Sequence, residues 1–365
     1  MGKAGFCFVA VISLCLFYNP SASGYEIEQA RHWVNGSNGI MDADIEDVVV
    51  STQDAEEVYI ISNKAVYMTG NSGESWSELL SFRTTENIIN AIALSGDSDT
   101  VYVGTTDGLF KGINRGSKWE RIFRGVGEPE NAVFAIAVNS QASEIIIIGT
   151  MSGIFVTEDS RRKWSKAKNI HAQSVITSIA VDGSNQNILY AASSNGAYKS
   201  FDSGGSWIRI YELITPEEDY QYLFEDEDED ISEIKYVIKS RDILIDSEDH
   251  RNIYLATSNG LFISLDEGRS WKSAGSSGLL SRNIRSVIST GDHILFAATD
   301  RGVFKYIKDS FRWQAMSEGL STTDIHSLDY SKNTGNDSMV LWSASGYGVF
   351  KTVRSAHGPI SGKKK

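Results

Sequence analysis

The sequence has 365 residues and a formal net charge of -13, from 34 basic and 47 acidic side chains. A chain of this length usually exceeds one simple core, so we expect two domains or one array of repeats. The acidic balance repels phosphate, and no stripe of Lys and Arg accompanies stacking aromatics, so a nucleic-acid partner is not expected.

The first predicted element is a signal peptide over residues 1–24. Lys3 supplies a short positive start, an apolar run covers 4–17, and small residues follow it. A membrane anchor is the weaker alternative, because the run is too short for a bilayer core of about 30 Å. Both cysteines, Cys7 and Cys15, lie in this segment. We therefore expect a protein exported to the periplasm or the extracellular space, without disulfides and without a membrane span once the signal is removed.

An eleven-residue frame of alternating apolar residues around a Gly turn recurs seven times in the rest of the chain. The copies begin at Val58, Val101, Ile146, Leu189, Ile253, Leu295 and Leu341. The accompanying tryptophans, Trp33, Trp76, Trp119, Trp164, Trp207, Trp271 and Trp313, are separated by 43, 43, 45, 43, 64 and 42 residues. A period of about 40 to 50 residues built from short strands and Gly-rich turns is typical of four-stranded β-propeller blades.

We predict an all-β fold, a single propeller of seven antiparallel four-stranded blades over residues 25–354. In the fourth copy the inner strand is expected over 176–182, followed by strands over 188–193 and 196–200 and an outer strand from the Trp. The last copy has no Trp strand after it, whereas Trp33 has no strands before it. Pairing these two ends closes the ring and removes both sheet edges, so we also expect a monomer.

The same eight-residue turn recurs as SFDSGGSW from Ser200 and as SLDEGRSW from Ser264. In each copy the Asp can accept backbone hydrogen bonds, the Gly can take positive φ, and the Trp can pack on the sheet. We predict this structural role for Asp202, Gly204, Trp207, Asp266, Gly268 and Trp271. The turn resembles the bacterial neuraminidase repeat, or BNR/Asp-box, and the resemblance covers nearly all of the chain after residue 24.

The Asp-box resemblance implies a propeller fold and little about activity. Similar repeats occur in sialidases, xyloglucan-degrading enzymes, sortilin-type receptors and the photosystem II assembly-factor family. Sialidases resemble six-bladed propellers with an early Arg-Ile-Pro, which this sequence lacks. Xyloglucanases look like two seven-bladed propellers with one catalytic Asp from each, and this chain has length for one. The chain resembles the photosystem II assembly-factor family in size, blade number and turn style. Members of that family look like scaffolds with a basic docking patch, whereas this chain is acidic.

The single long interval between tryptophans contains an acidic insertion at about 212–235. Residues 217–233 include ten acidic side chains and no basic one. Three interpretations stay open: a solvated loop, a docking loop for a basic partner, or a weak cation sink. It is not an EF-hand, because it lacks the ligand spacing and the turn Gly of a calcium loop. The tail 355–365 is expected to be flexible, and whether the sequons at Asn35 and Asn336 are glycosylated is left open.

No catalytic residue, cofactor or metal site is predicted from the sequence. It contains neither a G-x-S-x-G nucleophile elbow nor an H-E-x-x-H motif, and the six His are widely scattered. A glycosidase would need two carboxylates about 5 to 10 Å apart across a cleft, and no motif identifies such a pair.

A binding surface is expected at the mouth of the central channel, where the inner strands begin. Aligning the blades there gives Glu46, Asn90, Phe134, Thr177, Arg241, Arg285 and His326. One interpretation is that these residues only hydrate the channel. The other is that Arg241, Arg285 and His326, with Glu46 beside them, form a basic arc that binds a carboxylate-bearing ligand.

These observations favour a non-catalytic exported propeller that binds a protein or a glycan as an assembly, scaffold or adhesion module. The binding surface would be the channel mouth or the acidic segment 217–233. The alternative is a glycoside hydrolase of the xyloglucanase type. Two carboxylates facing each other across an open groove would favour that alternative.

Overall fold

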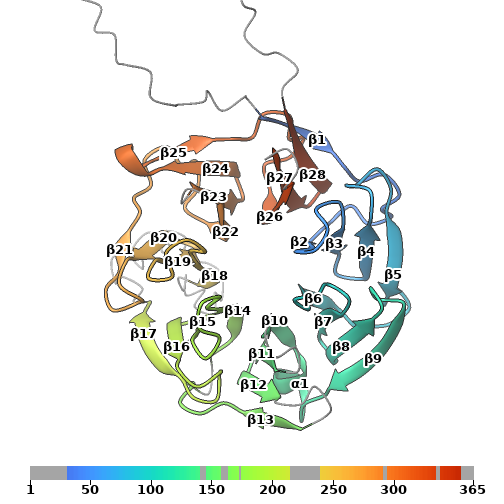
Figure 1. Ribbon diagram of the computed structural model, residues 1–365, viewed down its shortest axis with the longest axis vertical. Helices are drawn as coiled ribbons and strands as arrows, with labels where there is room; N and C mark the ends of the chain where they lie inside the picture. The colour runs from blue at the N-terminus through green and yellow to red at the C-terminus, as the bar shows by residue number, and fades with distance from the viewer. Residues whose placement is uncertain are drawn as a thin grey trace, which may run out of the picture.

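The computed structural model contains seven antiparallel four-stranded sheets arranged as a ring around a central channel (Figure 1). The prediction of a seven-bladed β-propeller is confirmed. The structure describes residues 31–139, 145–157, 163–171, 174–213, 239–290, 294–333 and 338–354.

Each blade has an inner, a second, a third and an outer strand, in that order from the channel outwards. The first blade comprises β2 (Asp47–Val50), β3 (Val58–Ile61), β4 (Ala65–Thr69) and β5 (Ser77–Ser81). The second comprises β6 (Ile89–Leu94), β7 (Val101–Thr105), β8 (Gly108–Ile113) and β9 (Lys118–Phe123). The third comprises β10 (Val133–Val138), β11 (Ile146–Thr150), β12 (Gly153–Thr157) and β13 (Trp164–Lys166), and the short helix α1 (Glu128–Asn131) precedes it.

The remaining blades follow the same plan. The fourth comprises β14 (Ile176–Val181), β15 (Leu189–Ser193), β16 (Gly196–Ser200) and β17 (Ile208–Glu212). The fifth comprises β18 (Ser240–Ile245), β19 (Ile253–Thr257), β20 (Gly260–Ser264) and β21 (Lys272–Ser273). The sixth comprises β22 (Ile284–Thr290), β23 (Ile294–Thr299), β24 (Gly302–Ile307) and β25 (Arg312–Ala315), with the 3₁₀ helix η3 (Lys308–Ser310) before its outer strand. The seventh comprises β26 (Ile325–Asn333), β27 (Ser338–Ser345), β28 (Gly348–Arg354) and β1 (Arg31–Asn35).

The hydrophobic core lies between adjacent blades. Every residue of the second strand β15 and of the third strand β16 is buried, because both faces of these strands contact a neighbouring blade. The outer strand β17 is exposed at its first, second and last residues. One cluster shows the arrangement: Ile147 and Ile154 of the third blade pack with Tyr198 and Trp207 of the fourth. Apolar burial between blades therefore stabilises the ring as a whole.

The ring closes by pairing the two ends of the described chain. Strand β1 is antiparallel to β28, with Trp33 opposite Thr352 (Figure 1). The Trp33 side chain is 1% exposed, and its indole nitrogen donates to the Met316 carbonyl oxygen at 2.5 Å. This confirms the predicted closure by the Trp33 strand. It also means that β1 covers the outer edge of β28.

Five tryptophans donate a hydrogen bond from the indole nitrogen to a carbonyl oxygen of the preceding blade. The pairs are Trp33 with Met316, Trp76 with Gly36, Trp119 with Leu79, Trp164 with Ile122 and Trp313 with Gly275. Trp207 and Trp271 differ, because they donate to Gly204 and Gly268 of their own turns. The periodic Trp is therefore an inter-blade connection in most blades, which the sequence pattern alone did not indicate.

The two repeated eight-residue turns have the same hydrogen bonds. In the first, Asp202 accepts from the Ser206 amide at 2.8 Å and from the Ser206 hydroxyl at 2.7 Å, and Gly204 has φ +91°. In the second, Asp266 accepts from the Ser270 amide at 2.8 Å and hydroxyl at 2.6 Å. Each Asp thus holds the turn between the third and outer strands closed.

We expect the Asp266 carboxyl to titrate with a pKa of about 2, because the Ser270 hydroxyl, the Ser270 amide and the Ser264 hydroxyl all stabilise its charged form. Since this pKa is below the unfolded value of 3.8, the stabilisation is present above about pH 4 and is lost as pH falls towards 2. NMR titration of the carboxyl carbon measures this value. Ser270→Ala should raise the Asp266 pKa, whereas Ser206→Ala, in the other turn, should leave it unchanged. An unchanged Asp266 pKa in Ser270→Ala would contradict the assignment.

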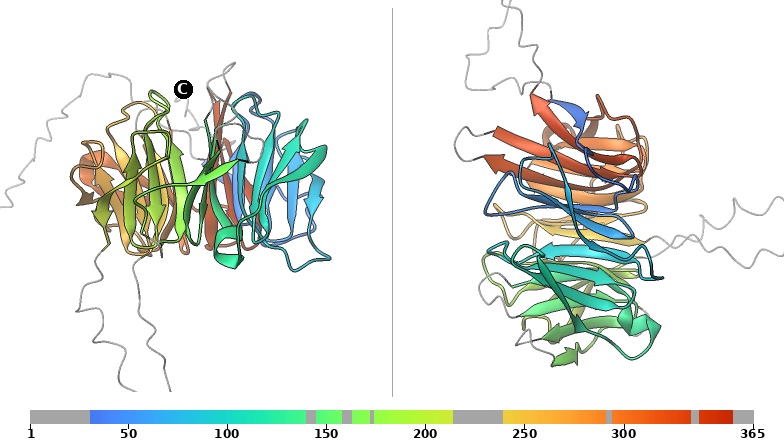
Figure 2. Two further views of the ribbon diagram at one scale, coloured as in Figure 1. Left: turned by 90° about the horizontal axis from the view of Figure 1, so that it is seen from below. Right: turned by 90° about the vertical axis from the view of Figure 1, so that its right-hand side faces the viewer.

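The strands run between two faces of the ring, which appears edge-on in Figure 2. The mouth face is the one at which the inner strands begin and at which turns join the second and third strands. The opposite face holds the turns between third and outer strands, and Arg31 and Arg354 pair there. Because β17 ends and β18 begins at the mouth face, the chain leaves and re-enters the described structure there, at Leu213 and Lys239.

Several sequence predictions concern segments outside the described residues. They are the signal peptide 1–24, the acidic segment 217–233, the tail 355–365 and the sequon at Asn336. Asn35, the other predicted sequon, is the last residue of β1, and its side-chain oxygen accepts from the Ser37 amide at 2.8 Å. Within the described ranges, no helix combines the length and the apolarity needed to cross a membrane.

Candidate functional site

The channel opens at the mouth face into a cavity of about 1060 Å³. All seven blades contribute to its wall. The wall includes every residue that the blade alignment placed at the channel mouth, namely Glu46, Asn90, Phe134, Thr177, Arg241, Arg285 and His326. These side chains lie together because each stands at or next to the start of an inner strand, and the inner strands converge on the channel.

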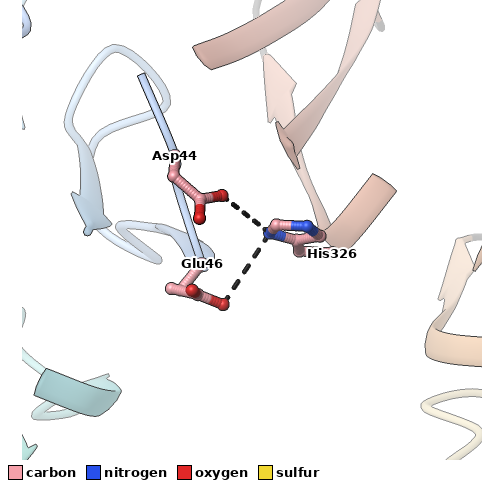
Figure 3. Close-up of side chains that lie close together, drawn as sticks. All are labelled: Asp44, Glu46 and His326. Atoms are coloured by element: carbon pink, nitrogen blue, oxygen red, sulfur yellow. Dashed lines mark ion pairs between the residues drawn. The ribbon is translucent and has the colours of Figure 1, made fainter. Parts of the chain in front are cut away.

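One side of the mouth holds a chain of charged groups around His326. Its Nε2 lies 3.3 Å from Asp324 Oδ2, and Asp324 Oδ1 lies 2.8 Å from Nη1 of Arg285. Its Nδ1 lies 3.7 Å from Asp44 Oδ1 and 3.7 Å from Glu46 Oε2 (Figure 3). The imidazole therefore lies between carboxylates on both sides.

Sequence analysis missed Asp44 and Asp324. Each stands two residues before an aligned position, Glu46 or His326, and alternate residues of an extended chain point to the same side. The same rule gives Asn283, two residues before Arg285, which also belongs to the mouth. The positions two residues before the aligned residues Glu46, Arg285 and His326 therefore contain all three.

Arg241 has a different environment. Its Nε donates to Asn283 Oδ1 at 3.0 Å, and Asn283 Nδ2 in turn donates to Asp300 Oδ2 at 3.4 Å. Within the described residues, Arg241 forms no ion pair. Burial, and then the positive charge of Arg285, lower the pKa of the Arg241 guanidinium.

The three cations of the predicted basic arc are therefore not equivalent. Arg285 and His326 already face carboxylates, whereas Arg241 has an amide neighbour. Counting Asp44, Glu46 and Asp324 against Arg285 gives this side of the mouth a formal charge of -2 with a neutral imidazole. Of these three cations, Arg241 is the one with no ion pair to a carboxylate among the described residues, so it is available to an acidic ligand. The carboxylates around His326 favour a positively charged group instead.

Glu46 lies among like charges. Burial is the largest influence and raises the pKa of its carboxyl; the Asp44 carboxylate raises it further, while His326 lowers it. A cation placed against Glu46 and Asp44 would relieve this repulsion.

Three more carboxylates stand deeper in the channel wall and connect neighbouring inner strands. Asp242 accepts from the Ser178 hydroxyl at 2.8 Å and from the Val287 amide at 3.0 Å, so it joins three blades. Asp329 accepts from the Val50 amide at 2.7 Å, and Asp47 hydrogen-bonds Ser327. These bonds link successive blades around the channel.

Burial raises the pKa of all three wall carboxyls. The value for Asp47 is about 7, with further contributions from the charges of Asp329 and Asp242. The value for Asp329 is about 6, and that of Asp242 is raised as well. Hydrogen bonds oppose the increase in each case, from side chains and backbone amides for Asp47 and Asp242 and from backbone amides for Asp329. The channel wall is therefore less negative at neutral pH than its composition suggests.

The mouth face also carries exposed apolar side chains. They come from loops or turns of the mouth face and include Met41, Ile88, Val126, Met151, Leu280 and Tyr347. Tyr347 is 68% exposed, and the preceding residue, Gly346, lies next to the Asp44 and Asp324 carboxylates. Exposed apolar side chains on one face supply surface that a binding partner can bury.

Solved structures with a similar fold come from proteins of several kinds. The extracellular domain of the putative hybrid two-component system BT4673 from B. thetaiotaomicron has a TM-score of 0.66 and 18% identity, over 88% of this chain and 39% of that one. YCF48 from Cyanidioschyzon merolae has a TM-score of 0.61 and 15% identity, over 88% and 98%. The GH74 xyloglucanase from Xanthomonas campestris has a TM-score of 0.59 and 13% identity, over 86% and 59%.

These identities establish a shared fold alone. This chain spans about two fifths of the BT4673 extracellular domain, since the match covers 39% of it. Neither a family model nor a curated protein matches the sequence.

Proposed function

We propose that this chain is a non-catalytic, exported propeller of the BNR/Asp-box type that binds a protein partner on its mouth face, as an assembly, scaffold or adhesion module. The observation that supports the proposal is the set of exposed apolar side chains on the face that also carries the charged channel mouth. Met41, Leu280 and Tyr347 are each exposed on this face. A protein partner would bury such apolar groups on binding, and this burial favours association.

A protein is favoured over a glycan because the exposed apolar side chains of the mouth face are mostly aliphatic and not aromatic. Sugar rings stack on aromatic side chains, and Tyr347 is the one aromatic among the exposed large hydrophobics of the described mouth face. The others are Met, Leu, Ile or Val, which pack against protein side chains. A glycan partner is therefore the alternative that the binding experiment described below must distinguish from a protein partner.

The fold similarity to GH74 enzymes supports a xyloglucanase-like hydrolase as the alternative. The arrangement of carboxylates at the channel mouth supports it less well. Asp44 and Glu46 come from one segment and face the same imidazole, instead of lying on opposite sides of a substrate. A glycosidase places its two carboxyl groups about 5 to 9.5 Å apart on either side of the scissile bond.

The test is capture of envelope or secreted proteins and, in parallel, a glycan array, both with the full chain. The triple variant Met41→Ser, Leu280→Ser, Tyr347→Ala should weaken partner affinity at least ten-fold, because each truncation of an interface anchor costs about 1 to 2 kcal/mol. The matched control is Phe201→Ser with Leu265→Ser, which removes exposed apolar groups from the opposite face.

Each result bears on the proposal. A protein partner that the mouth variant loses and the control keeps would support it. Binding to glycans without any protein partner would replace the protein by a carbohydrate. Equal losses in both variants, or hydrolysis of xyloglucan by the wild-type chain, would contradict it.

A further inference from the structure

We propose that Asp44, Glu46 and His326 bind a divalent transition-metal ion of the zinc class at the channel mouth. One ligand atom from each residue lies within 4.8 Å of the other two (Figure 3). A metal site is not predicted from the sequence, in which His326 is 280 residues away from Glu46. Closure of the ring places the seventh blade against the first and so brings His326 next to Glu46.

The separations suit a small ion. His326 Nδ1 is 3.7 Å from both carboxylate oxygens. Two ligands of a tetrahedral zinc ion with bonds of about 2.0 to 2.2 Å lie about 3.3 to 3.6 Å apart. The side chains of Asp44 and Glu46 are 59% and 42% exposed, so they are free to rotate. Small rotations would shorten the 3.7 Å separations to those of a tetrahedral site. The Ile45 carbonyl oxygen lies 3.0 Å from Nδ1 and accepts a hydrogen bond from this nitrogen when it is protonated. Once the ion has replaced that proton, this oxygen or a water molecule would be a fourth ligand atom.

The second shell has the arrangement that metal-bound histidines require. A ligating imidazole usually donates its other ring N–H to a carboxylate, which fixes the tautomer and the ring orientation. Here Nε2 of His326 faces Asp324 Oδ2 at 3.3 Å, and Arg285 holds the other oxygen of that carboxylate at 2.8 Å. With the Nε2 proton directed at Asp324, Nδ1 is the nitrogen that faces Asp44 and Glu46.

The charge of the cluster matches a divalent ion. Asp44, Glu46 and Asp324 carry three negative charges, Arg285 carries one positive charge, and a neutral imidazole leaves -2. A bound M²⁺ ion neutralises this charge, and it takes the place of any proton on Nδ1, which passes to solvent. The ion would also offset the mutual repulsion of the neighbouring Glu46 and Asp44 carboxylates.

The ligand set also selects the class of ion. One imidazole nitrogen with two carboxylates suits Zn²⁺ and, more weakly, Mn²⁺, whereas Ca²⁺ and Mg²⁺ prefer oxygen donors alone. The ion reaches the cluster from solvent, because Glu46, Asp44 and His326 all line the open cavity at the mouth face. This proposal does not depend on the proposed partner binding, and either can fail without the other.

The experiment is a titration of the full chain with Zn²⁺ alone, in competition with a chromophoric chelator. The wild-type chain should bind one Zn²⁺ more than His326→Gln, and Glu46→Gln should lose the same equivalent. Asp324→Asn should weaken this site by roughly ten- to a hundred-fold, as expected for a second-shell partner of a ligating histidine. His250→Gln is the matched control, because His250 also faces a carboxylate, Asp182 at 2.9 Å, away from this cluster.

Co²⁺ provides a second measurement that separates this site from the two cysteines of the sequence. The equivalent lost in His326→Gln should show visible bands of nitrogen and oxygen coordination without a thiolate charge-transfer band. Circular dichroism and melting temperature confirm that each variant is folded. The proposal is overturned if folded His326→Gln and Glu46→Gln bind as many Zn²⁺ ions as the wild type, with unchanged affinity.

Discussion

Trp33→Ala is expected to lower the free energy of unfolding by about 3 to 5 kcal/mol, the range for truncating a large, fully buried aromatic side chain. The side chain is 1% exposed and packs with Phe296 and Phe350, which belong to different blades. Its hydrogen bond to the Met316 carbonyl oxygen is lost as well. Because Trp33 lies on the strand that closes the ring, the variant should also aggregate more readily through the exposed edge of β28.

Urea unfolding followed by circular dichroism measures this loss. The control is Trp271→Ala, since Trp271 is only partly buried and donates its indole N–H within its own turn. It should lose clearly less stability than Trp33→Ala. Equal losses in the two variants would show that the closing strand has no special weight in the stability of the ring.

The protein is expected to be more stable at pH 5 than at pH 8, by about 2 kcal/mol, because of the carboxyls in the channel wall. The pKa of Asp47 is about 7 in the folded protein against 3.8 when unfolded, and that of Asp329 is about 6. Between about pH 4 and 7 the folded state therefore binds more protons than the unfolded state. Stability then falls as pH rises through this window. The full shift of Asp47 corresponds to about 4 kcal/mol, and water in the channel reduces this contribution.

Asp47→Asn assigns the effect to one residue. The amide cannot ionise, so the variant should gain about 1 to 2 kcal/mol relative to the wild type at pH 8 and show a smaller difference between the two pH values. Urea unfolding at pH 5 and pH 8 measures both quantities. Asp266→Asn is the control, because the pKa of Asp266 is about 2 and its titration lies below this window. An unchanged pH dependence in Asp47→Asn would contradict the assignment.

The repeat pattern of the sequence determined the architecture by itself. The tryptophan spacing gave the number of blades, and the unpaired Trp33 strand gave the closure that β1 and β28 form. Such predictions succeed because they depend on local periodicity and on the need to pair every sheet edge. The alignment of inner-strand starts also identified which residues line the mouth, since equivalent positions of a symmetric ring occupy equivalent places.

Only the tertiary structure decided what those residues do to one another. Arg285 pairs with Asp324 and His326 faces Asp44 and Glu46, so two members of the predicted basic arc are already partnered by carboxylates. These contacts depend on side-chain torsions and on the junction of the first and seventh blades, which periodicity does not specify. The carboxyl of Asp47 in the channel wall is a further property that the sequence does not reveal. In an alternating strand, a polar residue is normally predicted to face solvent. The raised pKa of Asp47 arises from burial where seven strands converge.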